Sequence, residues 1–244
     1  MSSITMLTIH AQFRGVTETI HPVVLQDESH LVLIDCGYVG FLPQIEQALT
    51  ENGFSAANLT HVFITHQDHD HMGALADLIK KYPHIKVVTS RREAPYISGA
   101  EKSLRLTQAE EMQEKLPPEQ QEFGKAFCAL LERVQAVPVD VEVSDGEELN
   151  WCGGCTVIAT PGHTPGHTSL YLKQFQTIIT GDAVALENGV PVIANPQFAL
   201  DLAQAEKSMQ MLFSYGAKEW ICYHGGRWIA SLQNEAESDK FFIK

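Results

Sequence analysis

The sequence has 244 residues, of which 44% are hydrophobic and 19% charged, and its formal net charge at pH 7 is −13. This composition is typical of a globular protein with a sizeable core, and no apolar run reaches the roughly 18 residues of a membrane span. The negative charge and the lack of a Lys/Arg-rich stripe argue against nucleic acid as a partner, because phosphate backbones would be repelled. Residues 1–10 lack the basic region and cleavage site of a signal peptide. We therefore expect a cytoplasmic protein with no membrane partner; the sequence predicts no oligomeric state.

The first half of the chain reads as alternating strands and helices. Short runs rich in β-branched and aliphatic residues predict strands at residues 4–13, 23–26, 31–35, 61–65 and 85–89. Apolar residues at helical spacing predict helices at 41–49, before the stop signal Asn52-Gly53, and from about 73 to 81. A polar loop rich in His and Asp separates strand 61–65 from the second helix.

Residues 91–134 differ from their surroundings, since they are rich in Glu, Gln, Lys and Leu and are broken by Pro117-Pro118. This stretch predicts two or three helices. Strands are then expected at 137–143, 156–160, 169–172, 177–180 and 220–223, with a helix at 199–213. This order favours an α+β fold in which two mixed sheets pack face to face with helices outside, a four-layer αββα sandwich. No linker is visible, so we expect a single domain, 1–244, with 91–134 as a helical insertion.

The densest group of metal-binding residue types is His66-Gln-Asp68-His-Asp70-His71, directly after a predicted strand. In extended chain, side chains at positions i and i+2 point the same way, so His66 and Asp68 can share one metal. Asp70 and His71 follow as the chain turns into the next helix and can reach a second metal. Imidazole and carboxylate together suit Zn, Fe or Mn.

Three further strand ends carry the same residue types. The segment Thr-Pro-Gly-His163-Thr-Pro-Gly-His167 forms a tight turn that presents a side chain, Thr-Gly-Asp182 ends the next strand, and Cys-Tyr-His224 ends the last. Any one of these segments could be a solvated polar loop. A His or Asp at the end of four predicted strands is harder to obtain by chance, and this favours a metal site.

At these residues the sequence resembles the metallo-β-lactamase superfamily, whose members include glyoxalase-II-type thioesterases and acyl-homoserine lactonases. The resemblance extends from Leu33-Ile-Asp35-Cys-Gly37 to His224 and implies the metallo-β-lactamase fold. It also implies two divalent metal ions per chain, bridged by Asp182 and held by His66, Asp68 and His163 on one side and by Asp70, His71 and His224 on the other. Asp35 would support the site without binding metal, and we interpret His167 as a hydrogen-bond partner behind the ligands.

Position 68 departs from the usual family pattern H-x-H-x-D-H, because it is Asp. Zn remains the first expectation, but a carboxylate is a harder ligand than imidazole and makes Fe or Mn more favourable. The oxygen-reducing diiron branch of the family also carries a carboxylate at this place. An alternative is that a slip of the loop makes His69 the ligand, although i and i+3 do not project together from extended chain.

The resemblance implies a metal-dependent hydrolase in which a metal-bound hydroxide attacks the carbonyl of a small-molecule ester, thioester or lactone. Asp70 is the candidate catalytic residue, which would orient the nucleophile and carry its proton. Tyr96 and Tyr223 are candidate phenol donors to the developing oxyanion, and 91–134 is expected to cover the active site and set substrate choice. One alternative is a diiron redox protein of the same fold, although the chain has no room for the accompanying flavin domain. Another alternative is an inactive metal-binding scaffold. The complete ligand set argues against it, because a decayed site should have lost ligands.

The segment Trp151-Cys152-Gly-Gly-Cys155 looks like a dithiol redox motif, but that motif needs a helix after it. Here a predicted strand follows, and Gly-Gly between two strand runs is a hairpin signal. We therefore predict that the two thiols have no redox role. The five cysteines of the chain are an odd number, which indicates reduced thiols rather than a disulfide framework.

Overall fold

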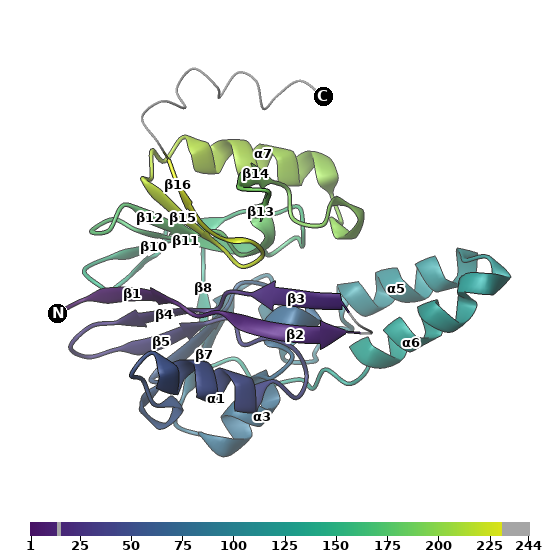
Figure 1. Cartoon of the computed structure of the whole chain (residues 1–244), viewed down its shortest axis with the longest axis horizontal. Helices are drawn as coiled ribbons and strands as arrows, with labels where there is room; N and C mark the ends of the chain where they lie inside the picture. Colours follow the sequence, from purple (N-terminus) through teal and green to yellow (C-terminus); the bar gives the residue numbers. More distant parts are fainter. Residues whose placement is uncertain (14–15, 231–244) are drawn as a thin grey trace.

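Two six-stranded sheets face each other at the centre of the structure, a computed structural model that describes residues 1–13 and 16–230 (Figure 1). The first sheet has the order β1 (Ser3–Met6), β4 (Val23–Gln26), β5 (Leu31–Ile34), β6 (His61–Ile64), β7 (Lys86–Ser90) and β8 (Val141–Val143). β1, β4 and β5 pair antiparallel, whereas β5 to β8 run parallel. The sheet is therefore mixed, as predicted.

The second sheet has the order β16 (Gly226–Ile229), β15 (Glu219–Cys222), β12 (Thr177–Ile179), β11 (Thr168–Leu172), β10 (Cys155–Ala159) and β9 (Glu148–Leu149). Its neighbours pair antiparallel except for β12 and β15, which are parallel. The parallel pair brings the carboxyl ends of β12 and β15 to the same edge.

Alternate residues along each strand separate the core into layers, as the period of two requires. Phe63 of β6 packs between the sheets with Val157 of β10, whereas Val62 and Ile64 face the other way. The outer face of the first sheet is covered by α1 (Leu42–Glu51) and α3 (Leu75–Lys81), and that of the second by α7 (Leu202–Phe213) (Figure 1). This is the αββα sandwich that the sequence predicts, so the fold class is confirmed.

Three expected elements differ from the structure. The strand predicted at 4–13 is two strands, β1 and β2 (Ile9–Phe13), and β2 pairs with β3 (Val16–Ile20) as a separate hairpin that satisfies its backbone groups. The strand predicted at 137–143 shortens to β8. Where one helix is predicted from about 73 to 81, the structure has the short helix α2 (His69–Met72), a turn at Gly73, and then α3. A Cβ at Gly73 would lie 2.2 Å from a backbone oxygen and 2.3 Å from a backbone nitrogen, so only glycine fits there.

The segment 91–134 forms α4 (Ala94–Ile97), α5 (Leu104–Lys115), a 3₁₀ turn (Pro118–Gln120) and α6 (Gln121–Leu131). α5 and α6 lie side by side and project from one end of the sandwich (Figure 1). Gln121 joins them, donating to the backbone oxygens of Gln113 and Leu116. A short hairpin of β13 (Ala185–Glu187) and β14 (Val190–Val192) was not predicted. Across the described ranges, the helices are too short or too polar to cross a membrane.

Candidate metal centre

The loops that follow β6, β10, β12 and β15 meet at one end of the sandwich. They carry all seven residues predicted to bind metal: His66, Asp68, Asp70, His71, His163, Asp182 and His224. The ligand atoms form three overlapping groups of three, and within each group they lie within 4.8 Å of one another. Residues up to 158 positions apart in the sequence (His66 to His224) thus become neighbours because the strands before them end at the same place.

The first group consists of His66, Asp68 and His163, all buried. Oδ2 of Asp68 lies 3.5 Å from Nε2 of His66 and 3.0 Å from Nε2 of His163. His69 belongs to none of the groups formed by the described residues. Its ring instead packs edge-on with that of Tyr38, at a centroid distance of 5.5 Å. This geometry favours Asp68 over His69 as the ligand.

The second group consists of Asp70, His71 and His224. Oδ2 of Asp70 lies 3.2 Å from Nε2 of His224 and 3.7 Å from Nε2 of His71. Asp182 lies between the groups. Its Oδ1 is 3.2 Å from His71 and 3.5 Å from His224, whereas its Oδ2 is 3.5 Å from His163. One carboxylate thus offers an oxygen to each side, which is the geometry of a bridging ligand.

The donor set fits divalent cations. Several buried atoms of the cluster have no hydrogen-bond partner among the described residues, among them His66 Nε2, Asp68 Oδ1, His71 Nε2, Asp182 Oδ1 and His224 Nε2. Buried polar atoms are normally paired, and leaving them unpaired is costly. Imidazole nitrogens and carboxylate oxygens are ligands of Zn, Fe and Mn, so bound cations would satisfy these atoms.

Asp35 stands behind His71, at the place where β5 ends. Its Oδ2 accepts hydrogen bonds from Nδ1 of His71 and from the Thr65 hydroxyl, both at 2.8 Å, and its Oδ1 accepts from the Thr65 amide at 2.9 Å. A proton held on Nδ1 leaves Nε2 of His71 as the free lone pair that faces the cluster. Asp35 thus orients a ligand-type side chain without entering any of the three groups.

His167 holds the loop of Asp182 in a similar way. Its Nε2 accepts a hydrogen bond from the Asp182 amide at 2.8 Å, and its Nδ1 lies 2.8 Å from the Thr160 hydroxyl. Burial and the neighbouring His66 and His163 keep the pKa of His167 well below its usual value. The ring is therefore neutral and serves to position Asp182.

The two predicted phenol donors lie differently from the expectation. The Tyr223 hydroxyl donates to the backbone oxygen of Asp70 at 2.5 Å, and its ring lies 3.9 Å from that of His71. This hydroxyl holds the loop that carries Asp70, and Tyr223 is not among the described residues that line the cavity above the cluster. Tyr96 is not among the described residues that line the cavity above the cluster, so the geometry does not support a substrate contact for it.

Glu93 is a buried residue of the site that the sequence interpretation missed. Its Oε2 accepts from the Gln67 amide at 3.0 Å, and its Oε1 accepts from the Gly166 amide at 3.0 Å and from the Thr164 hydroxyl at 2.6 Å. It therefore ties the His66 loop to the His163 loop. Burial raises the pKa of Glu93 to about 7, against the lowering effect of these hydrogen bonds. Glu93 comes three residues after β7, so the strand-end rule could have found it had it included Glu.

Arg105 was also missed. It lies in the first turn of α5, is 3% exposed, and donates to Oδ2 of Asp68 from Nε at 2.9 Å and from Nη2 at 2.6 Å. Nη1 donates to the backbone oxygen of Phe198 at 2.5 Å and to the Gln108 side chain. Burial would raise the pKa of Asp68, but the Arg105 charge and the nearby histidines hold it well below its usual value. Nothing in the local sequence distinguishes Arg105 from a solvated helix residue.

A cavity of about 630 Å³ opens above the cluster. Asp68, Asp70, Asp182 and His224 line it on the metal side. α6 contributes an apolar wall made of Phe123, Ala126, Phe127 and Leu130, and other parts of the lining include Gln12, Glu18 and Thr19 of the β2–β3 hairpin. The candidate ligands are thus reached from a space that is partly apolar.

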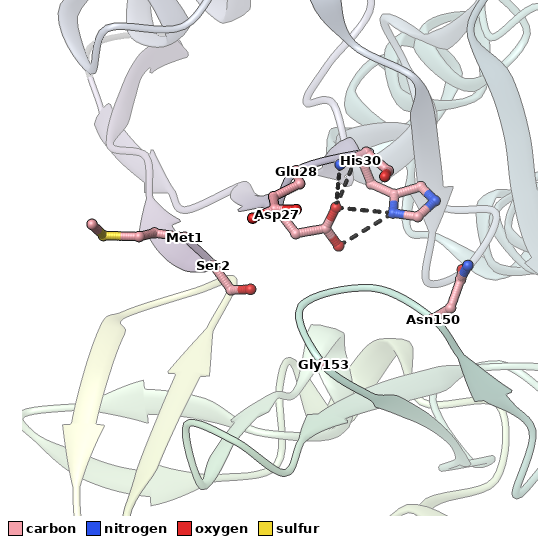
Figure 2. Close-up of a pocket in the computed structure, with 8 residues that line it drawn as sticks. Met1, Ser2, Asp27, Glu28, His30, Asn150 and Gly153 are labelled. Carbon is pink, nitrogen blue, oxygen red and sulfur yellow. Dashed lines mark hydrogen bonds and ion pairs between the residues drawn. The ribbon is translucent and has the colours of Figure 1, made fainter.

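A second cavity, of about 330 Å³, lies between the start of the chain and the loop before β10 (Figure 2). Its lining includes the Asp27 carboxylate, which Figure 2 shows paired with His30. The amides of Ser29, His30 and Cys152 also donate to it, each at 2.8 Å. Burial opposes these bonds, but they lower the pKa of Asp27 to about 2. The carboxylate is therefore satisfied by the protein itself, and no buried side-chain polar atom without a partner lines this cavity among the described residues.

The pair Cys152 and Cys155 lies in a tight turn between β9 and β10. Cys152 has φ 51° and Gly153 has φ 78°, and no helix follows. The Cys152 thiol donates to the backbone oxygen of Gln26 at 3.3 Å. Burial raises the pKa of both thiols. These are the properties of packed side chains, in keeping with the predicted hairpin.

Known proteins are similar to this chain in sequence and in fold. The family model described as the metallo-beta-lactamase superfamily matches residues 18–224. The uncharacterised protein YobT of Bacillus subtilis (strain 168) is 30% identical over 197 residues, which are 78% of this chain and 76% of YobT. The probable metallo-hydrolase YflN of the same organism is 31% identical over 168 residues, covering 68% of this chain and 60% of YflN.

Solved structures agree in fold. The metallo-beta-lactamase family protein TTHA1429 from Thermus thermophilus superposes with a TM-score of 0.72 at 23% sequence identity, covering 98% of this chain and 78% of that one. At this identity the likeness concerns the arrangement of the two sheets and their helices.

Proposed function

Because the chain belongs to the metallo-β-lactamase superfamily, we propose that it is a metal-dependent hydrolase of small-molecule esters, thioesters or lactones. One observation carries the proposal. Seven ligand-type side chains converge beneath a partly apolar cavity, and several of their buried lone pairs have no partner among the described residues.

We expect two divalent ions per chain, held by the two groups described above and joined by Asp182. Zn is the expected ion, and the carboxylate of Asp68 also suits Fe or Mn. When bound, such ions supply Lewis acidity and lower the pKa of a water molecule toward 7. Asp35 and His167 would hold ligand side chains and loops in place, as outer partners of metal ligands commonly do.

Asp70 is the residue proposed to handle the proton. Burial would raise its pKa, but His71 and His224 hold it below its usual value, so the side chain is ionised at neutral pH. It borders the cavity, and the Tyr223 hydroxyl anchors its backbone. An ionised carboxylate at this position can accept the proton of an attacking water and pass it to the leaving group.

The wall formed by α6 supports the proposed substrate class. Its phenylalanine and leucine side chains offer contact to an apolar acyl group and keep water away from the reacting carbonyl. The wall comes from the segment predicted to set substrate choice. We therefore propose that the acyl part of the substrate lies against Phe127 and its neighbours on α6.

A substrate panel on metal-depleted and reloaded protein tests this function. Depletion by chelation should abolish the hydrolysis of esters, thioesters and lactones, and Zn²⁺ should restore it, with kcat/KM rising as the acyl chain lengthens. Asp70→Asn should lower kcat by about a hundredfold or more. If fully loaded protein hydrolyses no member of the panel faster than buffer does, the proposal is wrong.

The second candidate is a diiron redox protein, which the carboxylate at position 68 favours. Against it, the buried Arg105 pairs with Asp68 and offsets the extra negative charge. Iron-loaded protein that consumes oxygen in the presence of a reductant, and hydrolyses no ester, would favour this alternative.

A further inference from the structure

A guanidinium lies inside the first ligand group. Nη2 of Arg105 is 2.6 Å from Oδ2 of Asp68 and also 3.2 Å from Nε2 of His163. These two acceptor atoms are the ones that face His66 Nε2 in this group. Arg105 therefore contacts ligand-type atoms of two of the three residues in this group, and Oδ1 of Asp68 has no hydrogen-bond partner among the described residues.

At His163, the Arg105 guanidinium and a metal ion compete for the lone pair of Nε2. An imidazole nitrogen without a proton has one lone pair, which either accepts a hydrogen bond or binds a metal. Nε2 of His163 lies 3.2 Å from Nη2 of Arg105 and 3.0 Å from Oδ2 of Asp68. It either accepts from the guanidinium or carries a proton that it donates to the carboxylate, and in both cases it has no electron pair for an ion. The bond pattern at Asp68 adds to this, because its Oδ2 already accepts two charge-assisted hydrogen bonds from the guanidinium.

The second ligand group is built differently. Its ion pairs join Asp70 and Asp182 to histidines (His69, His71, His163 and His224), and no Lys or Arg of the described ranges takes part in them. No guanidinium or ammonium group of the described residues pairs with these ligand atoms, so an ion that enters would displace at most protons from the imidazole rings.

We propose that Arg105 is a competing internal cation that makes the two metal sites unequal. The group of Asp70, His71 and His224 binds its ion first and tightly. The group of His66, Asp68 and His163 binds an ion only when Arg105 withdraws. This inference rests on the metal centre of the proposed function, but it concerns the affinity of the sites and not the reaction.

The guanidinium of Arg105 can move away from Asp68 and His163, because it also contacts Phe198. Nη1 bonds to the Phe198 backbone oxygen, and the guanidinium lies 5.3 Å from the centre of the Phe198 ring. Arg105 also lines the cavity. A change of side-chain rotamer can therefore break the bonds to Asp68 and His163 and keep those to Phe198, while α5 stays capped by Ser103.

Calorimetric titration of metal-depleted protein with Zn²⁺ tests the proposal without any measurement of activity. The unaltered chain should bind two ions with dissociation constants that differ by about a hundredfold. Arg105→Met keeps the aliphatic stem and removes the donors, so the weaker event should tighten by about tenfold or more and the tighter one should stay the same. Arg105→Lys keeps the charge but loses the two-pronged geometry, and should tighten the weak event by a smaller factor.

Lys102→Gln is the matched control. It removes the same charge from the same segment, but Lys102 is exposed and pairs with Glu110, so both affinities should match those of the unaltered chain. His163→Ala should remove the weak event and His224→Ala the tight one. The reverse assignment would overturn the proposal.

Three other outcomes overturn it in distinguishable ways. A weaker second affinity in Arg105→Met means that Arg105 supports Asp68 as a ligand rather than competing with the ion. Two equal affinities in the unaltered chain that do not change in Arg105→Met reject the competition and leave the proposed hydrolase standing. If no Zn²⁺ binds to the chain or to any variant, both this inference and the metal centre of the proposed function fall.

Discussion

Replacing Glu93 with Gln probes the buried carboxylate that connects the two metal-bearing loops. Glu93 is fully buried and accepts three hydrogen bonds, from the amides of Gln67 and Gly166 and from the Thr164 hydroxyl. Gln has the same shape but carries one acceptor oxygen, so its amide group must face a donor. We expect this mismatch to destabilise the fold by about 1–3 kcal/mol at any pH.

The pKa of Glu93 adds a second, pH-dependent effect. Burial raises this pKa to about 7 from the ordinary value of 4.5. Because the folded state holds the proton more tightly, the contribution of Glu93 to stability is complete below pH 4.5 and is lost as the pH rises through 7. The difference between the two pKa values corresponds to roughly 3 kcal/mol. The glutamine side chain of the variant does not titrate. The difference in free energy of unfolding between the unaltered chain and the variant should therefore shrink by roughly this amount as the pH rises from 4.5 to 8.

Urea unfolding of both proteins at several pH values between 4.5 and 8 measures this difference. The proteins should be metal-depleted, since bound cations would change the charge near Glu93. Other titrating groups are common to both proteins and cancel when the two free energies of unfolding are subtracted. A difference that varies by less than about 1 kcal/mol over this range would refute a raised pKa. It would leave Glu93 with a purely geometric role.

Three further predictions concern the site and its surroundings. Asp68→Ala should weaken the binding of one Zn²⁺ by at least about tenfold, or ~1.4 kcal/mol, whereas His69→Ala should leave metal content unchanged. Equilibrium dialysis with elemental analysis measures both, and the opposite pattern would mean that the ligand is His69. Replacing Cys152 and Cys155 with Ser should keep turnover within about threefold, and a hundredfold loss, ~2.7 kcal/mol of barrier, would instead indicate a redox role. Phe127→Ser should raise KM for long-chain esters and leave metal content intact; an unchanged rank order of kcat/KM across the substrate panel would place specificity in the metal-bearing loops.

The sequence alone was enough for the layers of the fold and for finding the seven His and Asp side chains that the structure brings together. Runs such as 31–34 and 61–64 alternate between two apolar faces, and this period depends only on strand geometry. The His/Asp segments could be recognised because each directly follows such a run. The role of Asp35 beside His71 and that of His167 beside Asp182 came from the resemblance and from the turn motif, and the hydrogen bonds of the structure give both a physical basis.

Only the tertiary structure decided what surrounds the ligands. Arg105 meets Asp68 across 37 residues, Glu93 meets Thr164 across 71, and the Tyr223 hydroxyl meets Asp70 across 153. None of these pairs leaves a local signal, because each depends on how distant loops approach one another once the sheets have packed. Tyr223 illustrates the point: its residue type suggested a proton donor to substrate, but packing directs the hydroxyl to a backbone oxygen. A buried polar group takes the partner that the fold brings within reach, and one-dimensional spacing does not contain that distance.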